Sequence, residues 1–247
     1  MTLKPFWRYY GGKYRAASRY PPPRERLIVE PFAGAAGYAT RHHDLDVLLI
    51  DKNPIIAGIW AYLIRTPSAE IRRLPLVGPG GVHVETWPCD EAKHLAGFWL
   101  NDANVSPCIT PSAWARKHGE GEHGAVWGGW GVRARDRVAS QVDRIRHWRV
   151  ICGDYTEAPD VPATWFIDPP YNGRAGKHYP VRDVDYDALG SWCRTRRGTV
   201  IVCEQAGATW MDWTHTLTLR SASGVNRPKT SAEVVAIDDA PLFRVTP

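Results

Sequence analysis

The chain has 247 residues, of which 44% are hydrophobic and 23% charged, a composition typical of globular rather than disordered proteins. This length corresponds to one large domain, or to one domain with a sizeable insertion. The sequence contains no run of ~18 apolar residues and no signal-like stretch at its start, so we expect a cytoplasmic protein that does not bind membranes. Its five cysteines include no C-x-x-C pair, which argues against a disulfide framework.

Positive charge is unevenly distributed along the chain. The net charge is +5, but residues 1–26 carry +6, residues 116–149 carry +4 and residues 194–229 carry +4, which leaves −9 for the rest. Basic stretches on an acidic frame suggest a polyanionic partner held on one side. The alternative is that these charges only cover a solvent-facing surface.

Seven short apolar runs rich in β-forming residues predict seven strands. The first five are continuously apolar, as expected for parallel strands that are covered on both faces. We therefore expect an α/β fold with an open, mostly parallel sheet. The predicted strands are 27–29, 47–50, 150–152, 164–167, 200–203, 217–219 and 234–237.

A long interval separates the second and third predicted strands. Apolar spacing predicts a helix over 54–65 and another over 132–148. Between them, residues 78–131 are polar and rich in Gly and Trp, and a structureless loop of that length is abnormal in a compact domain. This segment is therefore interpreted as an insertion or subdomain.

The first predicted strand is followed by a turn of small residues, Glu30-Pro31-Phe32-Ala33-Gly34-Ala35-Ala36-Gly37. Small residues in the first βα turn let the backbone approach a ligand closely. Asp51, at the end of the next strand, lies where an acid can accept both hydroxyls of a ribose. An N-cap is the alternative role for Asp51, although Asn53-Pro54 is equally suited to it.

The sharpest local signal is Asp168-Pro169-Pro170-Tyr171, directly after the fourth predicted strand. An acid at the carboxyl end of a parallel strand faces the crevice in which open α/β sheets bind ligands. The two prolines fix the backbone, and the Tyr171 ring can stack on a planar group. A rigid turn with a capping Asp is the structural alternative.

A third element, Arg8-Tyr9-Tyr10-Gly11-Gly12-Lys13, combines flexible glycines with a Lys and aromatic rings, and its alternative is a flexible basic arm. The order of these motifs resembles the Dam-type DNA adenine-N6 methyltransferases of bacteria and phages. The resemblance covers nearly the whole chain and is weakest between 78 and 148.

The resemblance implies a Rossmann-like methyltransferase fold with a seven-stranded, mostly parallel sheet. Residues 1–77 and 149–247 then form the catalytic domain that binds S-adenosylmethionine, and 78–148 form an inserted target-recognition region. The implied cofactor-binding residues are Tyr9, Lys13, Glu30, Phe32, Gly34, Asp51, Asp154 and Asp168. Tyr9 replaces a Trp that is usual in the family, and Ala36 replaces the second Gly of its glycine-rich turn.

The implied catalytic residues are Asp168, Pro169, Pro170 and Tyr171. The Asp168 carboxylate and the Pro169 carbonyl accept hydrogen bonds from the adenine amine, which directs its lone pair at the methyl group. The base must be flipped out of the duplex, and Tyr171 is the expected stacking face.

Double-stranded DNA is the expected partner, and a monomer or weak dimer the expected state. The residues expected to bind DNA are Arg8, Arg116, Lys117, Arg133, Arg135, Asn226, Arg227 and Lys229. Seven of the twelve Trp lie between Asp51 and Arg149, and for several of them packing in a small core is favoured over base contact. A bacterial or phage-infected cell is the expected setting, with restriction-modification, phage protection and regulation all left open.

No metal site is expected, because five Cys and His residues of the insertion, considered as possible zinc ligands, fit no paired ligand motif. They are Cys89, His94, Cys108, His118 and His123. Three other functions stay open: the same chemistry on cytosine N4, the same chemistry on RNA, and a non-catalytic DNA-binding module that retains the fold.

Overall fold

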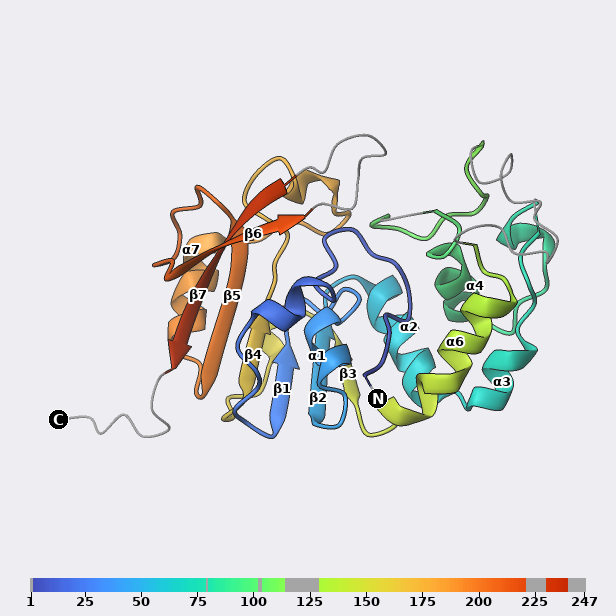
Figure 1. Ribbon diagram of the computed structural model, residues 1–247, viewed down its shortest axis with the longest axis horizontal. Helices are drawn as coiled ribbons and strands as arrows, with labels where there is room; N and C mark the ends of the chain where they lie inside the picture. Colours follow the sequence, from blue (N-terminus) through green and yellow to red (C-terminus); the bar gives the residue numbers. More distant parts are fainter. Residues whose placement is uncertain (1, 79, 102–103, 114–128, 221–229, 240–247) are drawn as a thin grey trace.

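A seven-stranded mixed sheet forms the centre of the molecule (Figure 1). The computed structural model describes residues 2–78, 80–101, 104–113, 129–220 and 230–239. The strand order is β3-β2-β1-β4-β5-β7-β6, and only β7 runs antiparallel to the others. All seven predicted strands are present, and the first five are parallel as expected. The strands are β1 (Leu27–Glu30), β2 (Asp46–Asp51), β3 (Arg149–Cys152), β4 (Thr164–Ile167), β5 (Thr199–Gln205), β6 (His215–Arg220) and β7 (Thr230–Asp239).

The sheet is covered on both faces, because successive strand side chains point to opposite sides. In β1, Ile28 belongs to one hydrophobic core and Val29 to the other. The first core also contains residues of α1 (Gly37–Arg41) and α2 (Pro54–Arg65), and the second those of α7 (Tyr186–Arg194). Burial on both faces explains why these strands are continuously apolar.

The predicted helix over 54–65 is confirmed as α2, with Pro54 at its first turn. The Asn53 side chain caps it by accepting a hydrogen bond from the Ile55 amide at 3.1 Å. The second predicted helix is shorter than expected: α6 spans Val132–Val142 and is followed by a 3-10 turn, η3 (Asp143–Ile145). Trp148 lies between η3 and β3, where the chain turns into the sheet, and its ring is buried against Trp60.

Short helices gather beyond the β3 edge of the sheet (Figure 1). They are α3 (Ser68–Arg73), η2 (Val82–Val84), α4 (Asp90–Gly97) and α6. The helix α3, which the sequence did not predict, packs against α6, and α4 packs against α2. In the described residues no helix has both the length and the apolar content needed to cross a bilayer.

Of the five described Trp between Asp51 and Arg149, four are buried, which confirms their interpretation as core residues. They are Trp60, Trp99, Trp130 and Trp148. The indole N–H of Trp99 donates to the Phe6 carbonyl at 2.9 Å, and that of Trp130 to the Pro75 carbonyl at 2.9 Å. Trp114 and Trp127 lie outside the described residues. The four buried rings join the helices to the N-terminal segment and to the core of the sheet.

Candidate functional site

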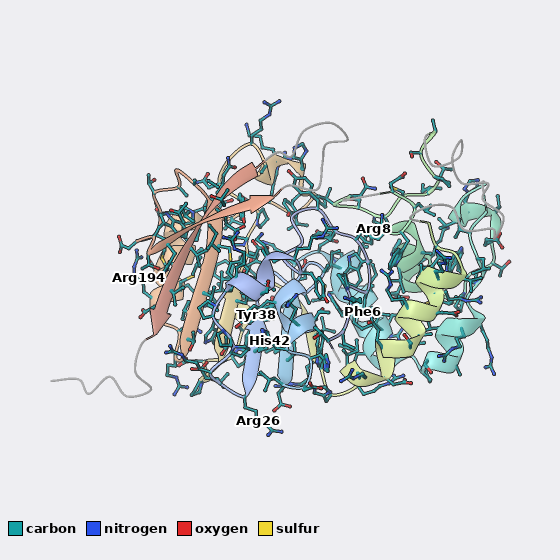
Figure 2. All side chains as sticks on the ribbon, viewed as in Figure 1. Phe6, Arg8, Arg26, Tyr38, His42 and Arg194 are labelled. Atoms are coloured by element: carbon teal, nitrogen blue, oxygen red, sulfur yellow. The ribbon has the colours of Figure 1, made fainter. Side chains whose placement is uncertain are left out.

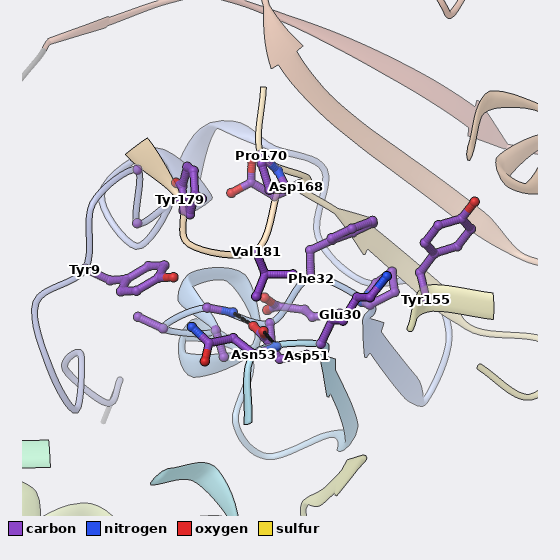
Figure 3. A pocket seen from close by; sticks show the side chains of 18 of the residues that line it. Tyr9, Glu30, Phe32, Asp51, Asn53, Tyr155, Asp168, Pro170, Tyr179 and Val181 are labelled. Atoms are coloured by element: carbon purple, nitrogen blue, oxygen red, sulfur yellow. Dashed lines mark hydrogen bonds between the residues drawn. The ribbon is translucent and has the colours of Figure 1, made fainter. Parts of the chain in front are cut away.

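A cavity opens at the carboxyl ends of β1, β2 and β4, with an empty volume of about 860 Å³ that includes its mouth. In Figure 3, Asp168 and Pro170 lie above it and Asp51 and Asn53 below, while Tyr9 and Tyr155 stand at opposite ends. All eight residues expected to bind a cofactor line this cavity. They are Tyr9, Lys13, Glu30, Phe32, Gly34, Asp51, Asp154 and Asp168.

The glycine-rich turn and Asp51 are joined by backbone hydrogen bonds. The Gly34 amide donates to Asp51 Oδ2 at 2.9 Å, and the Asn53 amide donates to Oδ1 at 2.9 Å. Burial raises the pKa of Asp51 to about 6, although these two hydrogen bonds act in the opposite direction. Ala36 adopts a left-handed backbone with φ of 45°, a conformation that favours glycine. Ala36, where the sequence departs from the glycine-rich pattern that it resembles, therefore occupies a position with a glycine-like backbone.

Glu30, at the end of β1, is almost fully buried and joins the strand to α1. Its Oε1 accepts a hydrogen bond from the Ala39 amide at 2.6 Å. Burial raises the pKa of Glu30 to about 8, because the charged form loses its hydration. Glu30 is thus uncharged at pH 7 and borders the cavity as a neutral acid.

This shifted pKa predicts how stability depends on pH. The folded state keeps the Glu30 proton up to about pH 8, whereas the unfolded chain releases it near the ordinary value of 4.5. The free energy of unfolding therefore falls between pH 4.5 and 8, and Glu30→Gln is expected to remove that part of the decline. The two proteins should differ in slope by up to about 1.4 kcal/mol per pH unit, measured by urea unfolding. Parallel curves would show that Glu30 does not carry this proton.

The N-terminal motif is packed in place, so the alternative of a flexible basic arm is wrong. Phe6 and Trp7 are buried in the same core as α2. Lys13 is 7% exposed, and the 3-10 turn η1 (Ala16–Arg19) follows it. A Cβ on Gly37 would approach the Tyr14 amide to 2.4 Å. Glycine at position 37 therefore lets the N-terminal motif lie directly against the glycine-rich turn.

The Lys13 ammonium forms a partly buried ion pair with Asp168. Its Nζ lies 2.6 Å from Asp168 Oδ1 and 2.8 Å from Oδ2. Burial raises the pKa of Asp168 to about 6; the Lys13 charge lowers it, whereas the charges of Glu233 and Glu204 raise it. Burial alone would lower the pKa of Lys13, but the two carboxylates of Asp168 and Glu233 raise it above its usual value. Two motifs separated by 155 residues thus meet at one charged contact.

The D-P-P-Y segment is held by hydrogen bonds on either side of its prolines. Tyr186 of α7 donates to the Pro170 carbonyl at 2.5 Å, and the Asn172 amide donates to Glu204 Oε2 at 2.9 Å. Pro170 lines the cavity and Pro169 is buried. The Tyr171 ring is half-buried, and its hydroxyl donates to Glu233 Oε2 at 2.6 Å. The segment is therefore anchored in a single conformation beside the cavity.

The far end of the cavity is formed by the segment after β3. Asp154 begins the 3-10 turn η4 (Tyr155–Glu157) with a capping box, and its Oδ2 lies 3.2 Å from Lys52 Nζ. Burial would raise the pKa of Asp154, but hydrogen bonds from Thr156 and Lys52 lower it below its usual value. Phe32 and Tyr155 stack with ring centroids 5.6 Å apart. These rings form an aromatic wall next to an ionised carboxylate.

Several residues of the site were not expected from the sequence, among them Tyr179 and Glu233. Tyr179, after the 3-10 turn η5 (Gly176–His178), lines the cavity, and its hydroxyl donates to the Tyr10 carbonyl at 3.0 Å. Glu233 of β7 is 3% exposed and contacts both Lys13 and Tyr171. An acid inside an apolar strand was the available signal for Glu233, but its partners are more than sixty residues away.

Of the residues expected to bind DNA, the structure describes three. Arg8 and Arg133 are exposed, whereas Arg135 is half-buried and donates to the Leu74 carbonyl at 3.0 Å. The Arg8 guanidinium lies 5.8 Å from the centroid of Trp99, and that of Arg137, which the sequence did not single out, lies 5.4 Å from it. The remaining five lie outside the described residues: Arg116, Lys117, Asn226, Arg227 and Lys229.

Arg8 and Arg26 belong to the same basic stretch but lie at opposite ends of the sheet (Figure 2). Arg26 precedes β1 and pairs with Asp46 at 3.2 Å. The stretch 1–26 therefore does not form one continuous surface.

The described residues contain no group of three or more His, Cys, Asp or Glu side chains that could hold a metal ion. Cys89 and Cys108 are free and half-buried, while His118 and His123 lie outside the described part of the chain.

The cavity is acidic: besides the protonated Glu30, four carboxylates line it, against two lysines. Such a lining suits a ligand that carries positive charge. The acids are Glu30, Asp51, Asp154, Asp168 and Asp183, and the lysines are Lys13 and Lys52.

Models of known protein families and a set of curated proteins were compared with the chain, and neither comparison found a match.

Proposed function

We propose that this protein is an S-adenosylmethionine-dependent methyltransferase that acts on the N6 amine of a flipped adenine in double-stranded DNA. One observation carries the proposal: Asp168, at the carboxyl end of β4, borders the same cavity as Gly34 and Asp51. The strand order, with antiparallel β7 between β5 and β6, is consistent with a methyltransferase-like fold. Among the described residues, the exposed Arg8 and Arg133 are the proposed contacts to DNA.

The chemistry and charge of the residues around the cavity support the binding of S-adenosylmethionine. Asp51 is available to accept hydrogen bonds from ribose hydroxyls, and Phe32 and Tyr155 offer flat faces to an adenine ring. Glycine at position 34 lets the Tyr9 ring lie directly against the turn, because a Cβ there would approach this ring to 3.1 Å. The acidic lining complements the positive sulfonium, and the bound cofactor supplies an electrophilic methyl group.

Asp168 acts on the amine that receives the methyl group. The N6 lone pair is delocalised into the purine ring, so the free amine is a weak nucleophile. Hydrogen bonds from this amine to the Asp168 carboxylate and the Pro169 carbonyl favour a tetrahedral nitrogen. When bound, S-adenosylmethionine would supply the methyl group for the new C–N bond, and its sulfur would keep the electron pair of the S–C bond. The proton that the nitrogen must lose passes to Asp168 or to water.

Positioning supplies most of the rate increase in such a direct transfer. Tyr186 and Glu204 fix the D-P-P-Y segment, and Lys13 orients the Asp168 carboxylate. No covalent intermediate on the protein is needed.

The proposal is tested by incubating the protein with labelled S-adenosylmethionine and duplex DNA, single-stranded DNA or RNA. The products are digested, and the methylated nucleoside is identified by mass spectrometry. N6-methyladenine from duplex DNA is the expected result. N4-methylcytosine would show that cytosine is the target base, and methylated RNA would show that RNA is the substrate. DNA binding without any methylation would support the non-catalytic module.

DNA binding is expected to weaken steeply with salt, because phosphate contacts release condensed counterions. Arg8→Gln and Arg133→Gln should each reduce the slope of log K against log salt by about one, measured by fluorescence anisotropy. Arg26→Gln is the matched control, since Arg26 lies at the other end of the sheet and should leave the slope unchanged. A flat salt response of the wild type would exclude these two arginines as DNA contacts.

A further inference from the structure

Glu233 is a buried acid whose two carboxylate oxygens both have partners. It is 3% exposed, in a strand paired on one side with Gln205 of β5 and on the other with Leu217 of β6. A carboxylate buried inside a sheet is costly unless it is paired and hydrogen-bonded. Tyr20 donates to Oε1, and Tyr171 donates to Oε2 at 2.6 Å.

The same carboxylate lies next to the Lys13 ion pair. Glu233 Oε2 is 3.7 Å from Lys13 Nζ, on which both Asp168 oxygens also converge. The ammonium lies 4.8 Å from the centroid of the Tyr171 ring. Glu233 therefore joins the N-terminal motif and the D-P-P-Y motif through two side chains.

Local sequence holds Lys13 only in part, through a hydrogen bond from its Nζ to the Gly11 carbonyl at 3.2 Å, and gives Tyr171 no such contact through its hydroxyl. Lys13 has a long flexible side chain, which loses conformational freedom when its charge is held. The Tyr171 ring is held at its hydroxyl end by Glu233, and without this acceptor a buried hydroxyl would lack that partner. The contacts of Glu233 in β7 with the Tyr171 hydroxyl and the Lys13 ammonium therefore place both groups relative to Asp168.

We propose that Glu233 is a positioning residue, which holds the Tyr171 ring and the Lys13 ammonium in the arrangement required for methyl transfer at Asp168. The inference rests on the proposed function, and it assigns Glu233 no contact with substrate or cofactor. A misplacement of about 1 Å far from the reacting atoms can cost on the order of 100-fold in rate, so removal of this anchor should be visible in kcat.

The test compares the variants Glu233→Gln, Tyr171→Phe, their combination, and Tyr20→Phe as the matched control. Tyr20→Phe removes the partner of the other oxygen and leaves the Tyr171 bond in place. Glu233→Gln should lower kcat by about 10- to 100-fold with a change of less than about 3-fold in KM for S-adenosylmethionine. Tyr171→Phe should lose about 10-fold, Tyr20→Phe should stay within about 3-fold of wild type, and the double variant should lose no more than Glu233→Gln.

A second readout does not depend on activity. Tyrosine labelled with ¹³C at Cζ gives an NMR signal for Tyr171, assigned by its absence in Tyr171→Phe. In Glu233→Gln this signal should shift, and calorimetric binding of S-adenosylhomocysteine should stay within about 3-fold of wild type as a check of folding.

The outcomes separate the two proposals. A wild-type protein that methylates no nucleic acid overturns the proposed function. An active wild type with unchanged kcat in Glu233→Gln, an unmoved Tyr171 signal, or fully additive losses in the double variant overturns the role of Glu233 alone. If Glu233→Gln does not fold, the loss in Tyr171→Phe with retained S-adenosylhomocysteine binding still decides whether the hydroxyl contact matters.

Discussion

Replacing Asp168 with alanine is expected to lower methyl transfer to duplex DNA by at least about 1,000-fold. The amine would lose its principal acceptor, and such electrostatic contributions in a buried site are commonly on the order of 100- to 1,000-fold each. The Lys13 ammonium would also lose a partner that now lies at 2.6 Å from it. Transfer is measured with labelled S-adenosylmethionine, and DNA binding, which uses a different surface, is expected to be largely retained.

Asp160→Asn is the matched control for this variant. Asp160 precedes the same strand, is exposed, and pairs with Arg197 at 3.3 Å away from the cavity. Its activity should stay within about 2-fold of wild type, as is usual for exposed sites. Retention of more than a few per cent of activity by Asp168→Ala would falsify the role assigned to this carboxylate.

Replacing Lys13 with glutamine is expected to move the pH dependence of activity. Asp168 must be ionised to accept hydrogen bonds from the amine, and its pKa is about 6 with the Lys13 charge lowering it. Activity of the wild type should therefore be present above pH 6 and be lost as the pH falls through 6. Without the ammonium the pKa of Asp168 rises, so the acidic limb should shift to higher pH and activity at pH 7 should fall by about 10-fold or more.

The shift is measured as kcat/KM for S-adenosylmethionine between pH 5 and 9. Asp51 also has a pKa of about 6, but Lys13 is not among the groups that shift it. Only the part of the acidic limb that reports Asp168 should move. Partial recovery of kcat/KM in Lys13→Gln at pH 8 to 9 would distinguish this effect from a general loss of activity. A uniform loss at every pH would mean that Lys13 acts in another way.

The D-P-P-Y motif and the glycine-rich turn could be placed from sequence because each directly follows an apolar run. Continuous burial on two faces leaves a readable run of apolar residues, and the chain must turn where it ends. This is why the seven strands, the helix over 54–65 and the positions of Asp51 and Asp168 were predicted. The helix over 132–148 was predicted too long, because its apolar spacing continues to Trp148. That residue is buried, but it lies after the end of the helix at Val142.

The contacts of Lys13 could not be predicted from local pattern. Lys13 is one of 31 basic residues, and nothing in its neighbourhood signals an ion pair with an acid 155 residues away. The same holds for Arg135, whose hydrogen bond to the Leu74 carbonyl is not signalled by its local sequence. A charged side chain looks alike in sequence whether it faces water, a phosphate or a buried partner.

The sequence by itself determined the α/β class, the parallel strands and the residues at their carboxyl ends, since these follow from burial, period and turn chemistry. Only the tertiary structure decided that these residues share one acidic cavity and that Glu233 joins Tyr171 to Lys13. The order β3-β2-β1-β4-β5-β7-β6 brings them together. Strand order depends on packing between distant segments, which no local pattern encodes.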